Sequence, residues 1–426
     1  MTSKHLRGGV SALSLLAALT LASAAQATEG YFQTGYGTNQ KALSGAGVAN
    51  PEDAMTLSVN PAGLVSVGRQ FQASFTLFSP HRSYEAGPTA MMPPNGFGLI
   101  PGKVDSNSTL FLMPNMAYSA PIDAQSAWGV ALFGNGGMST NYHSSVFYGG
   151  NAGVNLEQMF LSVGYARKMG DFSVGIAPVV AMQKFRAMGI GAMSQMSLHR
   201  DKFSDNGDDY SYGAGLRAGI QWDLTKSLRF GLSGQTPIWS TEFDKYSGLF
   251  AEGGSFDVPA SITAGLAWDV TPAVTLMADY RHIFYGSVKA ISNPSTNFGM
   301  CNPVTAPQYC FGGSNGSGFG WHDVDVFSIG AAWKVNPDLT LRVGYSHNTN
   351  PIKSADVMLN ILAPGVVTDH FSGGLSYNWS KNLTIDVAGA FVPSSSVSGF
   401  NPMAPDQSLR IKMYQYEASI GVRYRY

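Results

Sequence analysis

The chain has few charged residues. Asp, Glu, Lys and Arg make up only 12% of its 426 residues, about half the usual share in a soluble globular domain. Aromatic residues contribute another 12%, and there are 50 glycines. Because so few charges would cover a water-exposed surface poorly, the composition indicates a surface in contact with something other than water.

Long apolar runs are also missing beyond the first residues. The one apolar stretch, 10–22, follows Lys4 and Arg7 and precedes the small-residue segment 25–27, a pattern typical of a secretory signal peptide. We therefore expect export and cleavage after Ala27. A mature chain without apolar helical spans crosses a membrane only as a closed β-barrel.

Cysteine and excess positive charge are scarce as well. Cys301 and Cys310 lie in a Gly-, Asn- and Pro-rich segment, so we expect a disulfide in an exported protein, and metal binding needs more ligands than this segment offers. The formal net charge of −1 becomes −3 once Lys4 and Arg7 are removed, so no polybasic face invites nucleic acid. We expect no metal, no cofactor and no nucleic-acid partner.

The C-terminal segment alternates with a period of two residues. One register is apolar throughout: Tyr426, Tyr424, Val422, Ile420, Ala418, Tyr416 and Tyr414. The other register carries polar side chains and glycine. Aromatic residues at both ends of such a strand are typical of the interface girdles of outer-membrane barrels, and a terminal aromatic resembles their export signal.

Fourteen segments alternate in this way. They are 69–79, 108–119, 126–136, 156–167, 171–183, 209–222, 227–237, 256–268, 273–286, 322–334, 339–348, 370–379, 382–392 and 413–426. Long loops are expected after the odd-numbered segments, at 80–107, 137–155, 184–208, 238–255, 287–321, 349–369 and 394–410. An even strand count with long outer loops and short periplasmic turns predicts an all-β, 14-stranded antiparallel transmembrane barrel.

An aromatic residue recurs near the short turns. Trp222, Trp268, Trp333 and Tyr377 each stand six residues before the apolar residue that opens the next strand. The repeat predicts an aromatic anchor at the inner membrane interface, and chance spacing is the alternative.

Residues 28–68 do not alternate. Asn50, followed by a proline and two acids, is typical of a helix start, and Asn60-Pro61 repeats the device for a shorter turn. A barrel of this size has a lumen too wide for its wall side chains to fill. We therefore divide the chain into a signal peptide (1–27), a hatch that plugs the lumen (28–68) and the barrel (69–426); a periplasmic tail is the alternative for the second part.

Three stretches now resemble a known family. The mature start 29–32, the stretch 42–47, and above all Asn60, Pro61 and Ala62 resemble the hatch of the outer-membrane long-chain fatty-acid transporters of the FadL and toluene-transport type. The resemblance implies a 14-stranded barrel with an N-terminal hatch. It also implies capture of hydrophobic ligands by outer loops, passage to a pocket in the barrel, and lateral exit at a kink in the third strand.

The kink implied by the resemblance falls on a glycine-rich strand end, formed by Gly134, Asn135, Gly136 and Gly137. Glycines at a strand end are where a bulge can form. An ordinary glycine-rich exit into a loop is the alternative.

Two outer loops are rich in apolar residues. The third loop holds Phe185, Met188, Ile190, Met193 and Met196, a flexible surface that adapts to different ligands. The fourth places Trp239, Phe243, Tyr246 and Phe250 at spacings that predict one face of a helix. A shared ligand groove is the functional interpretation, and packing within the loops is the alternative.

Three arginines fall on the inward registers of their strands: Arg217, Arg281 and Arg342. One of them is a candidate to receive a ligand carboxylate. The alternative is pairing with acids of the hatch or barrel, such as Asp279.

Rival functions have weaker support. The stretch 312–316 matches a nucleophile-elbow pattern but lacks the strand–turn–helix context, so we expect no catalytic residue and no enzyme. An open porin needs a more charged lumen. A purely structural, adhesin-like barrel could bind calcium or lipid headgroups through the acidic loop 201–209, but solvation of this loop is the simpler interpretation. We expect a monomer in contact with outer-membrane lipid and lipopolysaccharide that takes up hydrophobic small molecules. Long-chain fatty acids are the first hypothesis, and aromatic hydrocarbons of the toluene type are the alternative.

Overall fold

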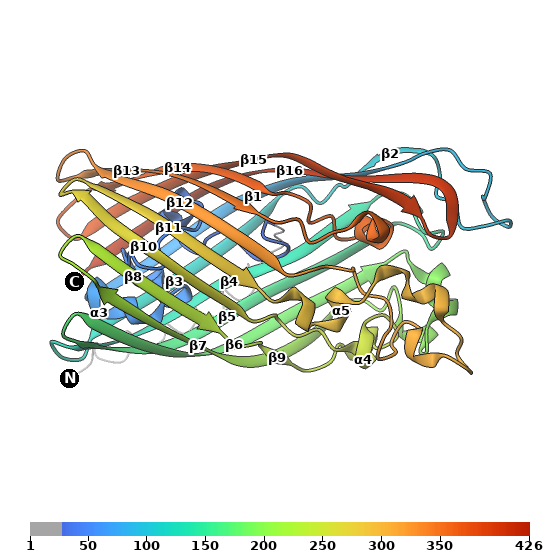
Figure 1. The fold of residues 1–426 in the computed structure, drawn as a ribbon, viewed down its shortest axis with the longest axis horizontal. Coiled ribbons are helices and arrows are strands. Elements are labelled where there is room, and N and C mark those ends of the chain that lie inside the picture. Colours follow the sequence, from blue (N-terminus) through green and yellow to red (C-terminus); the bar gives the residue numbers. More distant parts are fainter. Residues whose placement is uncertain (1–27) are drawn as a thin grey trace, which may run out of the picture.

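A computed structural model describes residues 28–426 as a closed antiparallel β-barrel that encloses the N-terminal hatch (Figure 1). Neighbouring strands pair along the chain, and the last strand returns to the first, from Gln70 opposite Arg425 to Ala86 opposite Leu409. The expected signal peptide lies outside the described residues, so its cleavage stays a prediction.

Fourteen long strands form the wall: β1 Gln70–Ala86, β3 Phe111–Pro121, β4 Ser126–Tyr142, β5 Ala152–Met169, β6 Phe172–Met188, β7 Asp209–Asp223, β8 Leu228–Gln235, β10 Ser261–Thr271, β11 Val274–Ile283, β12 Val324–Lys334, β13 Leu339–Asn348, β14 Asp369–Asn378, β15 Leu383–Asn401 and β16 Ala404–Arg425. Two short strands, β2 Gly102–Asp105 and β9 Trp239–Ser240, pair with β1 and β7 at the long-loop end. The predicted fourteen-strand barrel is confirmed.

The last hairpin differs from its prediction. Residues 394–410 were expected to be a loop, but β15 and β16 continue through them to a tight turn after Asn401, with Ser396 opposite Lys412. The backbone ladder that forms this hairpin does not depend on side-chain polarity. The hairpin therefore extends past the apolar band, where the sequence no longer alternates between apolar and polar residues.

The strand predicted at 256–268 also begins later than expected. β10 starts at Ser261, and Phe256 and Val258 are buried rather than facing lipid. Val258 forms an isolated bridge with Ile238, and Phe256 packs against Phe250 with ring centroids 4.9 Å apart. Alternation alone did not distinguish this loop packing from a wall strand.

Aromatic residues mark the short-turn end of the wall, where the C-terminus also lies (Figure 1). Trp222, Trp268, Trp333 and Tyr377 expose 49%, 50%, 51% and 45% of their surface, which is the outward orientation that an interface anchor requires.

The hatch is built from short helical turns inside the barrel: α2 Thr38–Ala42, η1 Ala54–Ser58, η2 Pro61–Gly63 and α3 Leu64–Val67 (Figure 1). Asn60 caps η2 as predicted, since its side chain accepts a hydrogen bond from the Ala62 amide. Asn50 does not start a helix; Asp53 caps η1 instead by accepting from the Met55 amide. In residues 28–426, no helix is long and apolar enough for a membrane span.

Short helical turns also fill the loops at the opposite end. They are η3 Gly191–Met196, η4 Arg200–Lys202, η5 Asp244–Tyr246, α4 Ala251–Gly254, η6 Tyr285–Ser287, α5 Lys289–Ser292, η7 Ser295–Met300, η8 Pro307–Tyr309, η9 Ser354–Asp356 and η10 Leu359–Ile361. These loops cover the lumen at the end away from the C-terminus (Figure 1).

The lipid-facing register of β16 can be tested by charge. Ile420, midway between the aromatic ends of the strand, exposes 55% of its surface, and Tyr424 near the short-turn end exposes 44%. Ile420→Lys should lower the free energy of unfolding by ~2–4 kcal/mol, and Tyr424→Lys by only ~0–1 kcal/mol, because the cost of a lysine is greatest at the bilayer midplane. Denaturant unfolding in lipid vesicles, followed by tryptophan fluorescence, measures both; equal costs would contradict this placement.

Candidate functional site

A β-bulge interrupts the wall in β4. Gly134 lies opposite Met159 and Gly136 opposite Gln158 on β5, so Asn135 is the extra residue. The bulge was expected where the strand ended, but β4 continues past it to Tyr142. The break in the ladder is therefore inside the wall rather than at an exit into a loop.

The hatch backbone pairs with this bulge. The Gln33 amide donates to the Asn135 carbonyl over 3.1 Å, and the Gly137 amide donates to the Tyr31 carbonyl over 3.0 Å. A Cβ atom at Gly136 would overlap that carbonyl oxygen, so only glycine allows the two backbones to come so close. Residues 31–33 of the hatch thus act as a short extra strand across the bulge.

The Asn135 side chain joins the same closure. Its oxygen accepts from the Tyr36 hydroxyl over 2.9 Å, and its amide donates to Gln158 over 3.0 Å. Gln33 donates to the Gly134 carbonyl over 2.8 Å. Polar groups that a bulge frees from the strand ladder are thus satisfied by the hatch.

The Asn60-Pro61-Ala62 motif fixes the other side of the hatch. The Asn60 amide nitrogen donates to the Val48 carbonyl and to the Ile220 carbonyl on β7, both over 2.9 Å. A Cβ at Gly175 on β6 would overlap the backbone of Pro61 and Ala62. The motif therefore ties the hatch to the wall strands β6 and β7.

Two of the three predicted arginines pair with hatch acids. Arg281 lies 2.9 Å from Glu29, and Arg342 lies 2.5 Å from Glu52. Asp279, the acid suggested for such a pairing, instead accepts from the Gly47 and Val48 amides, each over 2.8 Å. The Asp279 carboxylate therefore binds hatch backbone amides instead of an arginine.

Arg217 differs from the other two arginines. Its guanidinium donates to the Ser58 carbonyl and to the Gln235 side chain, and it lies 5.8 Å from the ring centroid of Phe133. In the described part of the chain it has no carboxylate partner, and it lines a cavity of about 40 Å³ together with Tyr36. Arg217 is therefore a buried cation that neighbouring dipoles satisfy but no acid neutralises.

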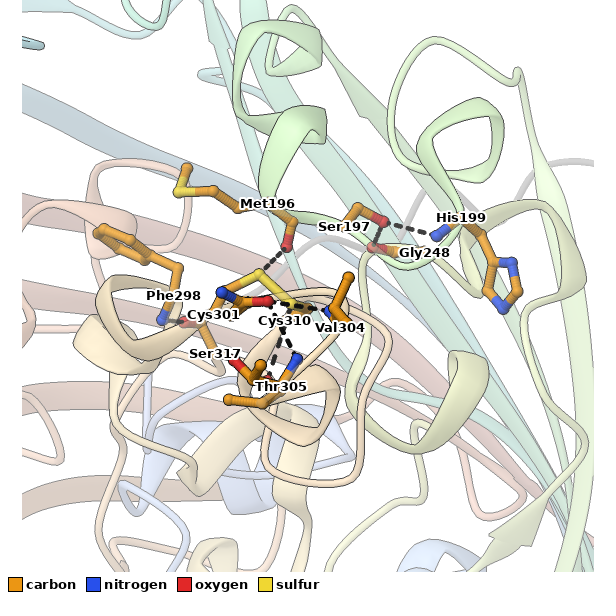
Figure 2. Close-up of a disulfide and its surroundings, with 12 residues drawn as sticks. Met196, Ser197, His199, Gly248, Phe298, Cys301, Val304, Thr305, Cys310 and Ser317 are labelled. Carbon is orange, nitrogen blue, oxygen red and sulfur yellow. Dashed lines mark hydrogen bonds between the residues drawn. A yellow bond between two sulfur atoms is a disulfide. The ribbon is translucent and has the colours of Figure 1, made fainter.

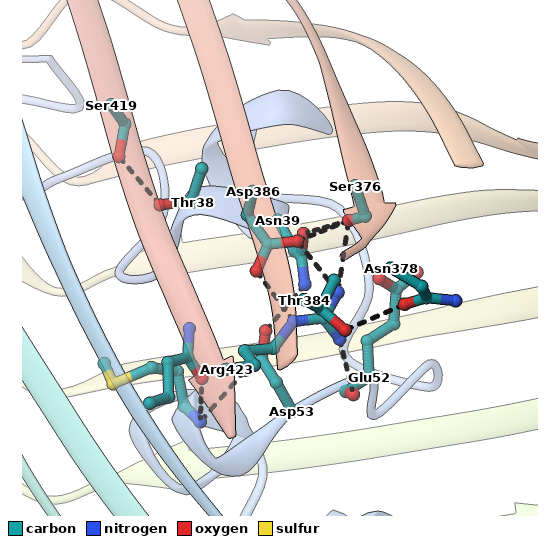
Figure 3. Close-up of polar contacts among 12 residues, drawn as sticks. Thr38, Asn39, Glu52, Asp53, Ser376, Asn378, Thr384, Asp386, Ser419 and Arg423 are labelled. Carbon is teal, nitrogen blue, oxygen red and sulfur yellow. Dashed lines mark hydrogen bonds and ion pairs between the residues drawn. The ribbon is translucent and has the colours of Figure 1, made fainter. Parts of the chain in front are cut away.

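A buried ionic network joins the hatch to the wall nearer the short turns (Figure 3). Asp386 on β15 accepts two hydrogen bonds from Arg423 on β16, over 2.7 and 2.8 Å. Ser376 accepts from Arg423 over 3.1 Å and from Arg342 over 2.6 Å. Burial opposes ionisation of Glu52, yet Arg342 and Arg423 hold its pKa below the usual value. The pair on β15 and β16 was not predicted, although both residues fall on the inward registers.

The aromatic residues of the third and fourth loops meet under the loops. Phe185 packs against Phe243, Tyr246 and Phe250 with centroids 5.6, 4.9 and 4.6 Å apart. The predicted single helix face is wrong, because this loop folds as two short turns, η5 and α4. Trp239, on β9, is 61% exposed and lies outside this cluster.

An apolar cavity of about 40 Å³ lies beside this cluster. Its lining includes four predicted residues, Phe185, Ile190, Met193 and Phe250. The remaining walls come largely from later loops: Val154, Leu249, Ala290, Phe311, Ser317, Gly318, Phe319, Leu359 and Leu362. Met188 and Met196 are half-buried outside this lining. The later loops cover the apolar side chains, so they form a closed pocket rather than an exposed groove.

A disulfide between Cys301 and Cys310 holds one wall of that pocket (Figure 2). Beside it, the Phe311 amide donates to the Met196 carbonyl over 2.9 Å, and the Leu198 amide donates to the Phe311 carbonyl over 3.1 Å. The disulfide-closed loop thereby docks onto the third loop and presents Phe311 to the pocket.

The closure of the bulge should depend on pH through Glu29. Burial raises the pKa of this carboxyl from 4.5 to about 7, against the opposing charge of Arg281. Because the packed hatch binds this proton more tightly than the open hatch does, protonation stabilises the packed hatch. This stabilisation is complete at a pH below the ordinary pKa of 4.5 and is lost as the pH rises towards 7. Opening of residues 31–33 should rise by up to about tenfold per pH unit between roughly pH 5 and pH 7.

Hydrogen exchange of the amides in residues 31–33, corrected for intrinsic rates, measures this opening. Glu29→Gln should flatten the profile, because no proton is then taken up at this position. A flat profile in the unaltered chain would contradict the assignment.

Comparison with known proteins agrees with this architecture. A family model described as outer membrane protein transport protein (OMPP1/FadL/TodX) matches residues 13–426. Long-chain fatty acid transport proteins of Salmonella typhi and Escherichia coli K12 are both 22% identical, over 389 and 394 residues, covering 84% of this chain and 85% of each relative.

Solved structures share the fold. The Pseudomonas putida toluene transporter TodX has a TM-score of 0.67 at 18% identity, covering 92% of this chain and 99% of its own. A Pseudomonas aeruginosa FadL homologue has the same TM-score at 16% identity and the same coverages. The relatives are transporters rather than enzymes, and this chain belongs to the OMPP1/FadL/TodX family of outer-membrane transport proteins.

Proposed function

We propose that the protein takes up hydrophobic small molecules, first among them long-chain fatty acids, and releases them sideways through the wall at the bulge of β4. The observation that carries the proposal is the pairing of hatch residues 31–33 with this bulge. Residues 31–33 cover an irregular stretch of the wall. If they moved away, a gap could open at this position.

Capture begins at the loops. The apolar pocket under Phe311 and Phe319 lies between several loops and the ends of the wall strands β5 and β6, which contribute Val154 and Phe185. Short helical turns of this kind move more easily than paired strands, so a ligand can enter when the loops separate. Apolar and aromatic walls favour a hydrophobic ligand, because its apolar surface leaves water when it binds.

Exit requires the hatch to release the bulge. Shifting residues 31–33 breaks the hydrogen bonds of Gln33 and Tyr31 to β4 and frees the Asn135 side chain from Tyr36. The gap left by the extra residue then faces the hydrocarbon of the membrane. A hydrophobic ligand gains by moving into that hydrocarbon without crossing water.

The preference for fatty acids rests on Arg217. This buried arginine has no acid partner in residues 28–426 and lies beside Phe133, two residues before the bulge. A carboxylate at this point would neutralise it through charge-assisted hydrogen bonds. An aromatic hydrocarbon would leave the charge as it is.

Aromatic-hydrocarbon uptake is the second candidate. Phe185, Phe250, Phe311 and Phe319 line the loop pocket, and aromatic walls of this kind suit a small aromatic ring better than a long chain. The same route through the bulge would serve both classes of ligand. We propose a monomer whose girdles contact outer-membrane lipid and lipopolysaccharide.

The route can be tested by removing the bulge. Deleting Asn135 should restore a continuous ladder between β4 and β5, so uptake of both labelled oleate and labelled toluene should fall at least tenfold in a deletion strain complemented with this variant. Deleting Pro94, an exposed residue of the loop between β1 and β2, is the control and should leave uptake unchanged. Unaltered uptake by a folded Asn135 deletion would rule out this exit.

The substrate class can be tested at Arg217. Arg217→Gln should reduce uptake of oleate at least fivefold and leave uptake of toluene within twofold, because only the acid carries a charge for this residue. Arg167→Gln, an exposed arginine near the short-turn end of β5, should change neither. Equal loss of both ligands would argue against a carboxylate contact, and unchanged uptake of both on deleting the whole gene would defeat the proposed function.

A further inference from the structure

A third cavity, unrelated to the hydrophobic route, opens at the short-turn end of the barrel. It has a volume of about 660 Å³ and lies between the hatch stretch 50–52 and the ends of the wall strands. Five cations line it: Arg229, Lys334, Arg342, Arg423 and Arg425. The only acids in the same lining are Glu52 and Asp269.

Three of the five cations are neutralised. Arg229 donates two hydrogen bonds to Asp269, over 2.6 and 3.1 Å. Arg342 is paired with Glu52, and Arg423 with an aspartate on β15 that lies behind the cavity wall. Within the cavity these pairs contribute directed donors but little net charge.

Lys334 and Arg425 are different. They lie at the ends of β12 and β16, and both side chains are exposed at the cavity. Among residues 28–426, neither forms a salt bridge or a side-chain hydrogen bond. Within residues 28–426, Lys334 and Arg425 are therefore two positive charges at the cavity without a contacting acid, although Lys334 lies near Glu52 and Asp269.

We propose that this cavity binds a small oxyanion, a carboxylate or a phosphate, with Lys334 and Arg425 as the charged ligands. A concave site with charge of one sign concentrates ions of the other sign, and lysine and arginine form their strongest hydrogen bonds with such oxygens. The volume is in the usual range for small-molecule sites. Its polar and charged lining excludes the hydrocarbon that the loop pocket suits.

The site faces the side where the short turns lie, which we expect to be the periplasm. The anion reaches it from that side without passing the hatch, since residues 50–52 form the inner wall of the cavity. The inference is therefore independent of the proposed transport and of its substrate.

The test uses the whole mature protein in detergent micelles. Inorganic phosphate and acetate are titrated separately by calorimetry, with sodium chloride holding the ionic strength constant. Saturable binding of at least one anion is expected, and Lys334→Gln and Arg425→Gln should each weaken it at least tenfold. Lys381→Gln, an exposed lysine in the turn between β14 and β15 and outside the cavity, should change it less than twofold.

The arms separate the sources of the oxyanion. Binding of phosphate alone assigns a phosphate site, and binding of acetate alone assigns a carboxylate site. Binding of neither anion, binding that survives both cavity variants, or equal weakening by Lys381→Gln would overturn the proposal. Heat-dependent migration on gels shows that each variant is folded before it is titrated.

Discussion

Inside a bilayer every backbone N–H and C=O group must find its partner within the protein, because no water is present to supply one. The chain meets this constraint by pairing β16 with β1 along the full length of β1. Closure with fourteen strands leaves a lumen wider than the wall side chains fill. The hatch, the loop cover and the ionic contacts inside the barrel all follow from that width.

The hatch packs against the wall through buried apolar side chains, such as Leu57, Leu64 and Leu43, and is also held by directed polar contacts. Asp279 binds two hatch amides, Asn60 binds a carbonyl of β7, and Arg281 and Arg342 pair with hatch acids. Such bonds fix one orientation, because each needs a specific donor and acceptor. They can also be exchanged for water or ligand groups one at a time, whereas a close-packed apolar plug resists partial release.

The bulge of β4 is the place where the wall does not satisfy its own backbone groups. One extra residue breaks the ladder between β4 and β5, and the hatch backbone supplies the missing partners. The wall is complete only while the hatch is in place. The hydrogen bonds that complete the wall at the bulge are therefore the same ones that the proposed side exit would have to break.

The sequence by itself determined the class of fold, the strand count and the inward and outward registers, because period-two alternation reports directly which residues face lipid. It also pointed to the helix cap at Asn60 and, through resemblance to a family, to an irregular strand at the glycines around Asn135. It placed β10 too early and ended β15 too soon, since alternation cannot separate loop packing from a wall strand, and a ladder continues where lipid no longer selects the side chains.

Only the tertiary structure decided which charges meet: Glu29 with Arg281, Glu52 with Arg342, and Asp386 with Arg423. Their pairing depends on strand stagger and on the path of the hatch, and neither is written in any local pattern of residues.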